Sequence, residues 1–270
     1  MGARVAVVIS RDSLAGPIIA ALQRAPGVES CERVRFDPAA MDAGALSRYD
    51  TIVYSALPAE SPDTGPDVTA AREFCERLAS LPLVHFVVIS SAAVYSPNHQ
   101  HTGLLPETTF IAAGRSAIAD NWRTVEQLTE MVGRESGAAP LTRTVLRPAA
   151  VLDGADYFSR LLTGRIAVTY PGHDPTIQFL SVDDFADAVA VAVMARRDAI
   201  WNVAPAAGIP ITKALRLSGA TRLPIGRLAQ NAMRVVTSQA GLASSADQLK
   251  YIQYCWTVSG DGVGSALRSL

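Results

Sequence analysis

The stretch from Leu83 to Tyr95 constrains the fold of this chain more than any other. Residues 83–89 are largely apolar or β-branched and show no regular alternation, which is typical of a central strand in a sheet covered on both faces. Small polar residues follow at Ser90 and Ser91. Ligands bind beyond the carboxyl ends of the strands in an open α/β sheet, so the pattern predicts Ser90, Ser91 and Tyr95 at the mouth of a crevice. The alternative interpretation is that the two serines only cap the following loop.

Strand-like and helix-like patterns alternate along the first 204 residues. This alternation predicts an α/β fold with a Rossmann-like doubly wound parallel sheet. Residues 1–204 would form a nucleotide-binding core, with substrate-side insertions around 150–180, and residues 205–270 a small, partly helical C-terminal substrate subdomain. The expected strands are residues 4–10, 32–36, 49–54, 83–89, 141–146 and 200–203, and the expected helices are 14–23, 68–78, 117–132, 157–162, 185–194, 225–237 and 246–253.

Composition argues against several classes of function. Of the 270 residues, 49% are hydrophobic and 18% are charged, which is enough to bury a large core. No apolar run reaches the roughly 18 residues that span a bilayer, and the chain enters its first strand without the basic segment and cleavage site of a signal peptide. We therefore expect a cytoplasmic protein with no membrane partner. The net charge of −1 provides no basic surface for nucleic acid.

Cysteine and histidine spacing predicts no metal site. The three cysteines are far apart, which argues against a disulfide framework and against zinc, so we interpret them as small core residues. His99 and His101 form a His-x-His pair in a polar loop. Two ligands without a third candidate nearby indicate solvated loop histidines rather than a metal centre.

The turn after the first strand is where a dinucleotide-binding fold carries its glycines. Against G-x-x-G-x-x-G the three positions are Ser10, Ser13 and Gly16, and against G-x-G-x-x-G they are Arg11, Ser13 and Gly16. Only the third glycine is present in either alignment. Side chains at the first two positions crowd the approach of the backbone to a pyrophosphate. The turn therefore weakens the expectation that NAD or NADP binds, and the cofactor could have been lost.

Two further positions are candidates for cofactor contact. Asp37 lies about 20 residues beyond the glycine turn, where an acid accepts hydrogen bonds from an adenosine ribose and favours NAD over NADP. The alternative is that Asp37 only starts a turn with Pro38. Ala56 lies in the loop after the strand at 49–54, and this loop would lie over the same crevice.

Four motifs together resemble the extended short-chain dehydrogenase/reductase family, the NAD-dependent epimerases and dehydratases. Their order and spacing are similar to the family's across residues 4–204. The resemblance implies that Ser91 is the catalytic serine and that the loop after Arg147-Pro148 lies near the nicotinamide end of the cofactor. It also implies a homodimer, formed through the helices at 68–78 and 117–132. The motifs are Val88-Ile-Ser-Ser-Ala-Ala-Val-Tyr95, Val145-Leu-Arg-Pro-Ala-Ala-Val151, Phe179-Leu-Ser-Val-Asp-Asp-Phe-Ala186 and Trp201-Asn-Val203.

The chain departs from this family at the proton-transfer pair. The family uses a tyrosine and, four residues later, a lysine that lowers the tyrosine's pKa. No tyrosine in this sequence is followed by lysine at that spacing. With Glu126 as a marker of register, Ile118 stands at the tyrosine position and Trp122 at the lysine position. Together with Tyr157 they would make the crevice apolar and suited to a hydrophobic or aromatic small-molecule ligand.

Two hypotheses follow. The first is an atypical enzyme acting on a small ketone, sugar or polyketide-like molecule without the Tyr/Lys pair. It would be a noncanonical NAD(P)-dependent reductase or epimerase-like enzyme, or a redox-free cyclase or isomerase, in which Ser91, Tyr95, His99 or His101 supplies a hydrogen bond or proton. The second is a cofactor-less pseudoenzyme that serves as a binding, regulatory or structural subunit. We favour the first because the polar motif at the crevice is retained.

Overall fold

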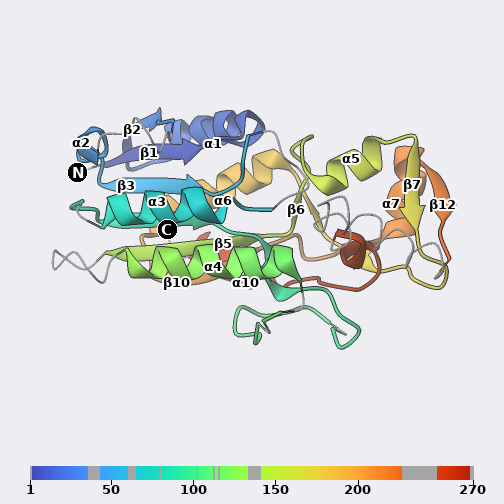
Figure 1. The fold of residues 1–270 in the computed structure, drawn as a ribbon. Coiled ribbons are helices and arrows are strands. Elements are labelled where there is room, and N and C mark those ends of the chain that lie inside the picture. Colours follow the sequence, from blue (N-terminus) through green and yellow to red (C-terminus); the bar gives the residue numbers. More distant parts are fainter. Residues whose placement is uncertain are drawn as a thin grey trace.

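A six-stranded parallel sheet organises the fold (Figure 1). The computed structural model describes residues 2–35, 43–59, 65–79, 81–101, 103–111, 113–114, 116–132, 141–226 and 248–267. The strand order is β10-β5-β4-β3-β1-β2, with β1 (Ala3–Ile9), β2 (Val28–Arg33), β3 (Thr51–Ser55), β4 (His85–Ile89), β5 (Thr142–Pro148) and β10 (Ala199–Val203). The order reverses between β1 and β3, the switch point at which such sheets bind ligands. The predicted Rossmann-like α/β fold is confirmed.

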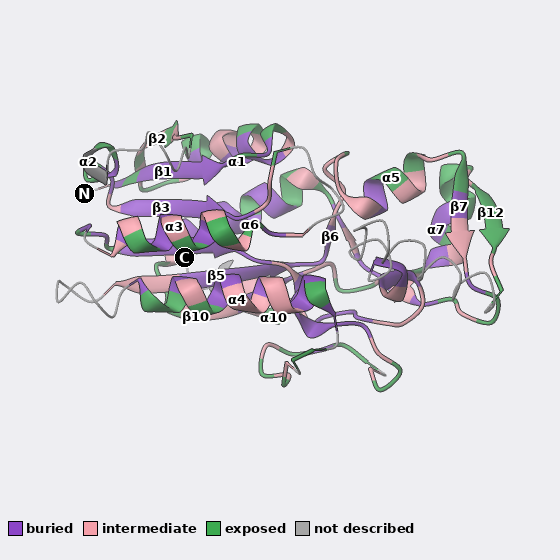
Figure 2. Ribbon diagram, viewed as in Figure 1, coloured by how far each residue is buried: buried purple, intermediate pink, exposed green. Residues whose placement is uncertain are grey.

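Helices cover both faces of the sheet (Figure 1). On one face α1 (Asp12–Arg24) packs against α6 (Val182–Ala195), and on the other α3 (Val68–Leu78) packs against α4 (Ala117–Met131). Each helix pair closes an apolar core over β3 and β4, which are buried along their whole length, as Figure 2 shows for β3. Burial on both faces explains why the sequence of β4 is apolar without alternation.

Side chains at the helix starts explain where most helices begin. Ser181 caps α6, and its hydroxyl oxygen accepts the backbone N–H of Asp184 at 3.0 Å. Asp67 caps α3 and Ser116 caps α4 in the same way, which satisfies amides that the first turn leaves unpaired. Helix α1 differs, because its N-cap residue Arg11 makes no side-chain capping bond.

A smaller lobe lies beyond the carboxyl ends of the strands (Figure 1). Its apolar core is continuous with side chains of the sheet region, including Ile118 and Trp122 of α4, and within it the Phe158 ring stacks on the Trp256 ring with centroids 5.7 Å apart. The short pair of β6 and β9 connects the lobe to the sheet region. The elements are β6 (Ala150–Val151), α5 (Tyr157–Thr163), β7 (Ile166–Thr169), β8 (Thr176–Ile177), β9 (Phe179–Leu180), β11 (Ile209–Pro210), α7 (Ile211–Ser218), β12 (Thr221–Pro224) and the 3-10 turn η2 (Leu249–Ile252).

The structure differs from the sequence prediction in the second strand and in the C-terminal segment, where the 3-10 turn η2 replaces the helix expected at 246–253. The second strand lies at Val28–Arg33 rather than at 32–36. It pairs with β1 at the edge of the sheet, is half-buried and carries polar residues, so it lacks the apolar run that marks the buried strands in the sequence. The last helix, α10 (Asp261–Leu267), packs against β10 and α6 of the core rather than within the lobe. Gly262 permits this approach, because a Cβ there would meet the Trp201 ring at 2.7 Å.

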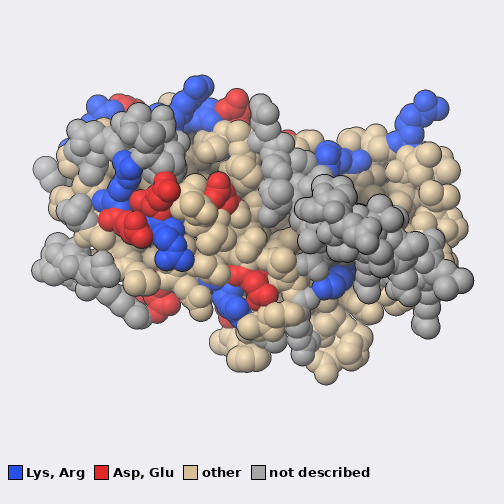
Figure 3. Space-filling view, viewed as in Figure 1, with Lys and Arg blue, Asp and Glu red and all other residues tan. Residues whose placement is uncertain are grey.

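Two other expectations concern the helix near the C-terminus and membrane-spanning segments. Most of the helix expected at 225–237 lies outside the described residues, and the short helix α2 (Ala43–Leu46) precedes β3. In the described part of the chain, every helix is too short or too polar to cross a membrane. Figure 3 shows acidic and basic side chains interspersed over the core half of the face in view.

Candidate functional site

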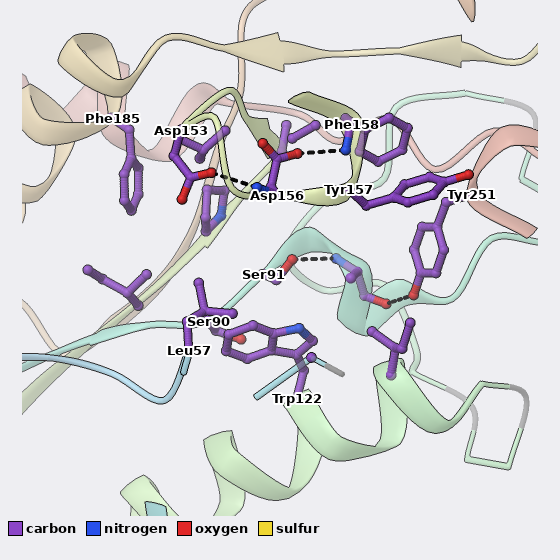
Figure 4. A pocket seen from close by; sticks show the side chains of 18 of the residues that line it. Leu57, Ser90, Ser91, Trp122, Asp153, Asp156, Tyr157, Phe158, Phe185 and Tyr251 are labelled. Carbon is purple, nitrogen blue, oxygen red and sulfur yellow. Dashed lines mark hydrogen bonds between the residues drawn. The ribbon is translucent and has the colours of Figure 1, made fainter. Parts of the chain in front are cut away.

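A pocket of about 160 Å³ lies between the ends of β4 and β5 and the smaller lobe. One wall carries Ser91 and Trp122, and the opposite wall carries Asp153, Asp156 and Tyr157 (Figure 4). Apolar and aromatic side chains make up most of the remaining surface. The lining includes Leu14, Leu57, Ile89, Ile118, Pro148, Phe158, Phe185, Tyr251 and Trp256. The residues expected to contact ligand at Ser91, Ile118, Trp122, Tyr157 and Pro148 are thus brought to one pocket.

The two serines after β4 have different partners. Ser91 is the N-cap of the 3-10 turn η1 (Ala92–Tyr95), and its Oγ accepts the backbone N–H of Ala93 at 3.1 Å. Tyr251 donates to the carbonyl of Ala93 at 2.9 Å and fixes this turn against the C-terminal segment. Ser90 donates to a carboxylate oxygen of Glu126 at 2.6 Å. Ser91 therefore caps the loop and faces the pocket at the same time, and its hydroxyl proton can donate to a ligand.

A buried charge network lies beneath the pocket. Arg147 binds Glu126 through two hydrogen bonds, of 2.9 Å from Nε and 2.7 Å from Nη2. Its Nη1 donates to the Tyr95 hydroxyl at 2.9 Å, and Tyr95 donates to Asn202 at 2.8 Å. Burial alone would lower the pKa of Arg147, but hydrogen bonding and the charge of Glu126 raise it. Burial raises the pKa of Tyr95, and Arg147 offsets only part of that effect. This network ties α4 to β5 with every charged group paired.

These contacts correct two expected catalytic positions. Tyr95 lies outside the pocket lining, and its hydroxyl is held between Arg147 and Asn202. His99 is exposed in a surface turn, and neighbouring His101 pairs with Asn98 at 2.8 Å. Neither Tyr95 nor His99 reaches the pocket. In the described part of the chain, no three His, Cys, Asp or Glu side chains group as a metal centre requires.

The expected cofactor positions are only partly assembled. Ala56 is buried, its carbonyl accepts the N–H of Asp67 at 2.8 Å, and Leu57 lines the pocket in its place. Gly16 lies within α1, where a Cβ would meet nothing within 4 Å, so close packing does not require glycine there. Arg33 donates to the carbonyl of Ser10 at 3.1 Å and covers the turn. Asp37 lies outside the described residues.

A second buried ion pair crosses the pocket's edge. Nη1 of Arg11 donates to Oδ2 of Asp153 at 3.0 Å, and the Ser13 hydroxyl donates to the same oxygen at 3.1 Å. The two charged side chains are only 5% and 2% exposed. Oδ1 of Asp153 accepts the backbone N–H groups of Ala155 and Asp156 at 2.9 and 2.8 Å. The sequence prediction missed Asp153, although an arginine inside the glycine turn indicates that a carboxylate is needed nearby.

The two carboxyls of this wall have pKa values shifted in opposite directions. Burial alone would raise the pKa of Asp153, but the hydrogen bond and charge of Arg11 and the two backbone N–H groups lower it. Burial raises the pKa of Asp156, and the charge of Asp153 adds to this, against hydrogen bonds from Ser159 and Phe158. The wall therefore holds one firm anion and one carboxyl that retains its proton more readily, an arrangement suited to acid–base roles.

Comparison with known proteins identifies the fold. No family model matches the sequence, and no curated protein matches it. The solved structure of gox2253 has a TM-score of 0.71 at 13% identity, covering 100% of this chain and 93% of that one. UDP-glucuronic acid 4-epimerase from Bacillus cereus, in complex with UDP-glucuronic acid and NAD, gives 0.70 at 12% identity over 98% and 93%. MoeE5, in complex with UDP-glucuronic acid and NAD, gives 0.64 at 17% identity over 99% and 100%.

This chain has the fold of the extended short-chain dehydrogenases/reductases. The resemblance predicted from the four sequence motifs is confirmed for the fold, which is all that a likeness at these identities shows.

The turn after β1 in this short-chain dehydrogenase/reductase fold differs from the glycine turn of a dinucleotide-binding fold. The fold places a pyrophosphate at the N-terminus of the first helix, against glycine backbone. In this chain the side chains of Arg11 and Ser13 project from that turn and hold the carboxylate of Asp153. The side chains of the turn after β1 therefore already bind a carboxylate of the protein itself.

Proposed function

We propose that this protein is an atypical small-molecule enzyme that catalyses a redox-free isomerisation or cyclisation of a small, largely apolar ketone or polyketide-like ligand. The observation that carries the proposal is the composition of the pocket. Trp122 and Ile118 form an apolar wall where the family's proton-transfer pair is expected, and Asp156 faces the same space with a raised pKa. Such a pocket favours an uncharged ligand and a carboxyl that exchanges a proton with it.

The roles of the residues follow from their positions. The Ser91 hydroxyl would donate a hydrogen bond to the ligand's carbonyl oxygen, which stabilises charge that develops there during enolisation. The Asp156 carboxylate would take a proton from the carbon beside the carbonyl, and the protonated Asp156 would then give that proton to a different carbon of the resulting enolate. The proton is returned, so the isomerisation balances without an oxidant or a reductant. Trp122 and Ile118 would exclude water and hold the ligand against Ser91.

Isotope exchange tests this proposal directly. The purified protein is incubated in D2O with a panel of cyclic ketones and β-diketones, and deuterium uptake at the carbon beside the carbonyl is followed by NMR. We expect protein-dependent exchange that falls about 100-fold in Asp156→Asn, the usual contribution of a positioned acid or base. Asp187→Asn, on the exposed face of α6, is the matched control and should retain the exchange rate. Equal exchange by wild type and Asp156→Asn would overturn the assigned role.

A ligand-binding protein without catalysis is the second candidate. The paired Tyr95 hydroxyl favours it, because the one tyrosine of the crevice motif is engaged in the buried network. This candidate predicts that ketones bind with a measurable dissociation constant while deuterium exchange stays at the rate of the free ligand. Mass spectrometry of molecules that copurify with the protein would identify the ligand class in either case.

A further inference from the structure

The turn that carries Ser91 is hydrogen-bonded to the smaller lobe through Tyr251. Tyr251 lies in η2 and is only 4% exposed, and its hydroxyl donates to the carbonyl oxygen of Ala93 at 2.9 Å (Figure 4). The backbone N–H of Ala93 donates to Oγ of Ser91 at 3.1 Å. Both backbone groups of Ala93 are therefore held, the N–H by the pocket serine and the carbonyl by the C-terminal segment.

The same turn ends in a strained residue. It closes through the N–H of Ser96, which donates to the carbonyl of Ala93 at 3.1 Å, and Ser96 has a φ of 53°. A residue other than glycine is disfavoured in this region and persists only where the surrounding structure holds it. The hydroxyl of Tyr251 supplies a second donor to the carbonyl that closes the turn. Loss of this hydroxyl should therefore loosen the turn and the serine at its start.

Tyr251 is itself held in one orientation. Its ring meets the Trp256 ring edge-to-face, with centroids 5.3 Å apart and an angle of 88° between the planes. Nε1 of Trp256 donates to the backbone carbonyl of Tyr251 at 3.2 Å. Further along the segment, the N–H and the carbonyl of Val258 pair with the side chain of Gln178 at 2.8 and 3.0 Å. These contacts direct the Tyr251 hydroxyl at Ala93 before any ligand binds.

We infer that Tyr251 is a positioning residue for the Ser91 hydroxyl, and that it acts through the backbone of Ala93. Because the N–H of Ala93 occupies one acceptor site of Oγ, the serine proton is directed elsewhere and can reach a ligand carbonyl in the pocket. A displacement of about 1 Å can cost a reaction roughly 100-fold in rate. The inference rests on the proposed function for the role of Ser91, and it assigns the C-terminal segment at 248–258 a part in that reaction.

Tyr251→Phe tests this role, because it removes the hydroxyl and keeps the ring against Trp256. Deuterium exchange into 1-indanone, followed over a range of ketone concentrations, separates kcat from KM. We expect kcat to fall about tenfold, because a displaced donor stabilises the developing charge less well. KM should stay unchanged, as for an interaction that strengthens only in the transition state.

Tyr49→Phe is the matched control. It removes a tyrosine hydroxyl that donates to Glu32 at 2.7 Å, just before β3 and so at the end of the sheet opposite the pocket. This variant should keep the wild-type kcat. An equal fall of kcat in Tyr49→Phe and Tyr251→Phe would reflect a general loss of stability and overturn the inference.

A double variant tests whether Tyr251 acts through Ser91. Ser91→Ala has no hydroxyl to position, so adding Tyr251→Phe to it should cause no further fall in kcat. A merely structural role would lower kcat by the same factor with or without the serine. Equal factors in the two backgrounds, or a wild-type kcat in Tyr251→Phe, would overturn the inference.

Amide hydrogen exchange of the protein separates this inference from the proposed function. If the wild-type protein exchanges no deuterium into any ketone of the panel, the proposed function fails, and the turn is then followed alone by mass spectrometry. Tyr251→Phe should speed exchange at residues 91–96 about fivefold over Tyr49→Phe, the size of one lost hydrogen bond, while α6 keeps its wild-type protection. Faster exchange there would support the positioning of Ser91 by Tyr251, and unchanged exchange would overturn it.

Discussion

Two buried arginine–carboxylate pairs lie within this fold, and they are built differently. Glu126 and Arg147 join α4 to β5 inside the core, where two direct hydrogen bonds pair the charges. Arg11 and Asp153 join the start of α1 to a loop of the smaller lobe through a single bond, and Nε of Arg11 has no hydrogen-bond partner among the described residues. Both pairs are almost fully shielded from solvent.

The two pairs differ in how completely their buried polar groups are hydrogen-bonded. The free-energy cost of burying a charged group is compensated only when the geometry of the pair is favourable and the remaining donors are hydrogen-bonded. The Glu126 pair meets this condition, since Ser90 and Tyr95 complete its network. The Arg11 pair meets it only in part. We therefore expect the first pair to contribute more to stability than the second, and the following predictions test that difference.

The largest loss of stability is expected when the pair of Glu126 and Arg147 is broken. Arg147→Met leaves the Glu126 carboxylate buried without its counter-ion, so the free energy of unfolding should fall by about 3–5 kcal/mol. Urea unfolding at pH 7 measures this loss. The double variant Glu126→Gln with Arg147→Met removes both charges and should be more stable than the single variant. A single variant that loses less than about 1 kcal/mol, the size of an exposed pair, would contradict the assignment.

A smaller loss of stability is expected when the pair of Arg11 and Asp153 is broken. In Arg11→Met the Asp153 carboxylate keeps the hydroxyl of Ser13 and two backbone N–H groups, so the loss should be about 1–3 kcal/mol, as for a hydrogen bond to a charged group. Arg24→Met is the control, because the pair of Arg24 and Asp187 is exposed and should contribute almost nothing. If Arg11→Met and Arg147→Met lowered the free energy of unfolding equally, the two pairs would contribute equally to stability and the expected difference would be wrong.

Most of the fold could be predicted from the sequence, whereas the two aspartates of the pocket, Asp153 and Asp156, could not. Apolar periodicity locates β4 and α4, and the register marked by Glu126 predicts Ile118 and Trp122 at the crevice, where both line the pocket. Asp153 was missed because its partner Arg11 lies 142 residues away in the chain. Tyr95 was placed in the pocket because a motif gives residue order and not side-chain direction, and here the hydroxyl turns to Arg147.

The smallest expected effect is on the pH dependence of stability. The contributions of Asp153 and Asp156 should change with pH in opposite directions. The pKa of Asp153 is lowered in the fold, so its contribution to stability is present above its unfolded pKa of about 3.9 and is lost as pH falls through the folded value. The pKa of Asp156 is raised in the fold, so its contribution is present below the unfolded pKa and is lost as pH rises through the folded value.

Unfolding free energies of Asp153→Asn and Asp156→Asn between pH 3 and pH 7 should therefore diverge. Relative to wild type, Asp153→Asn should lose stability as pH rises, and Asp156→Asn should gain it. Asparagine retains an oxygen that can cap α5 in place of Asp156, so the gain reports the charge rather than the cap. Equal slopes for the two variants would mean that Arg11 does not distinguish the carboxyls. The proton that the proposed chemistry requires at Asp156 would then have no physical basis.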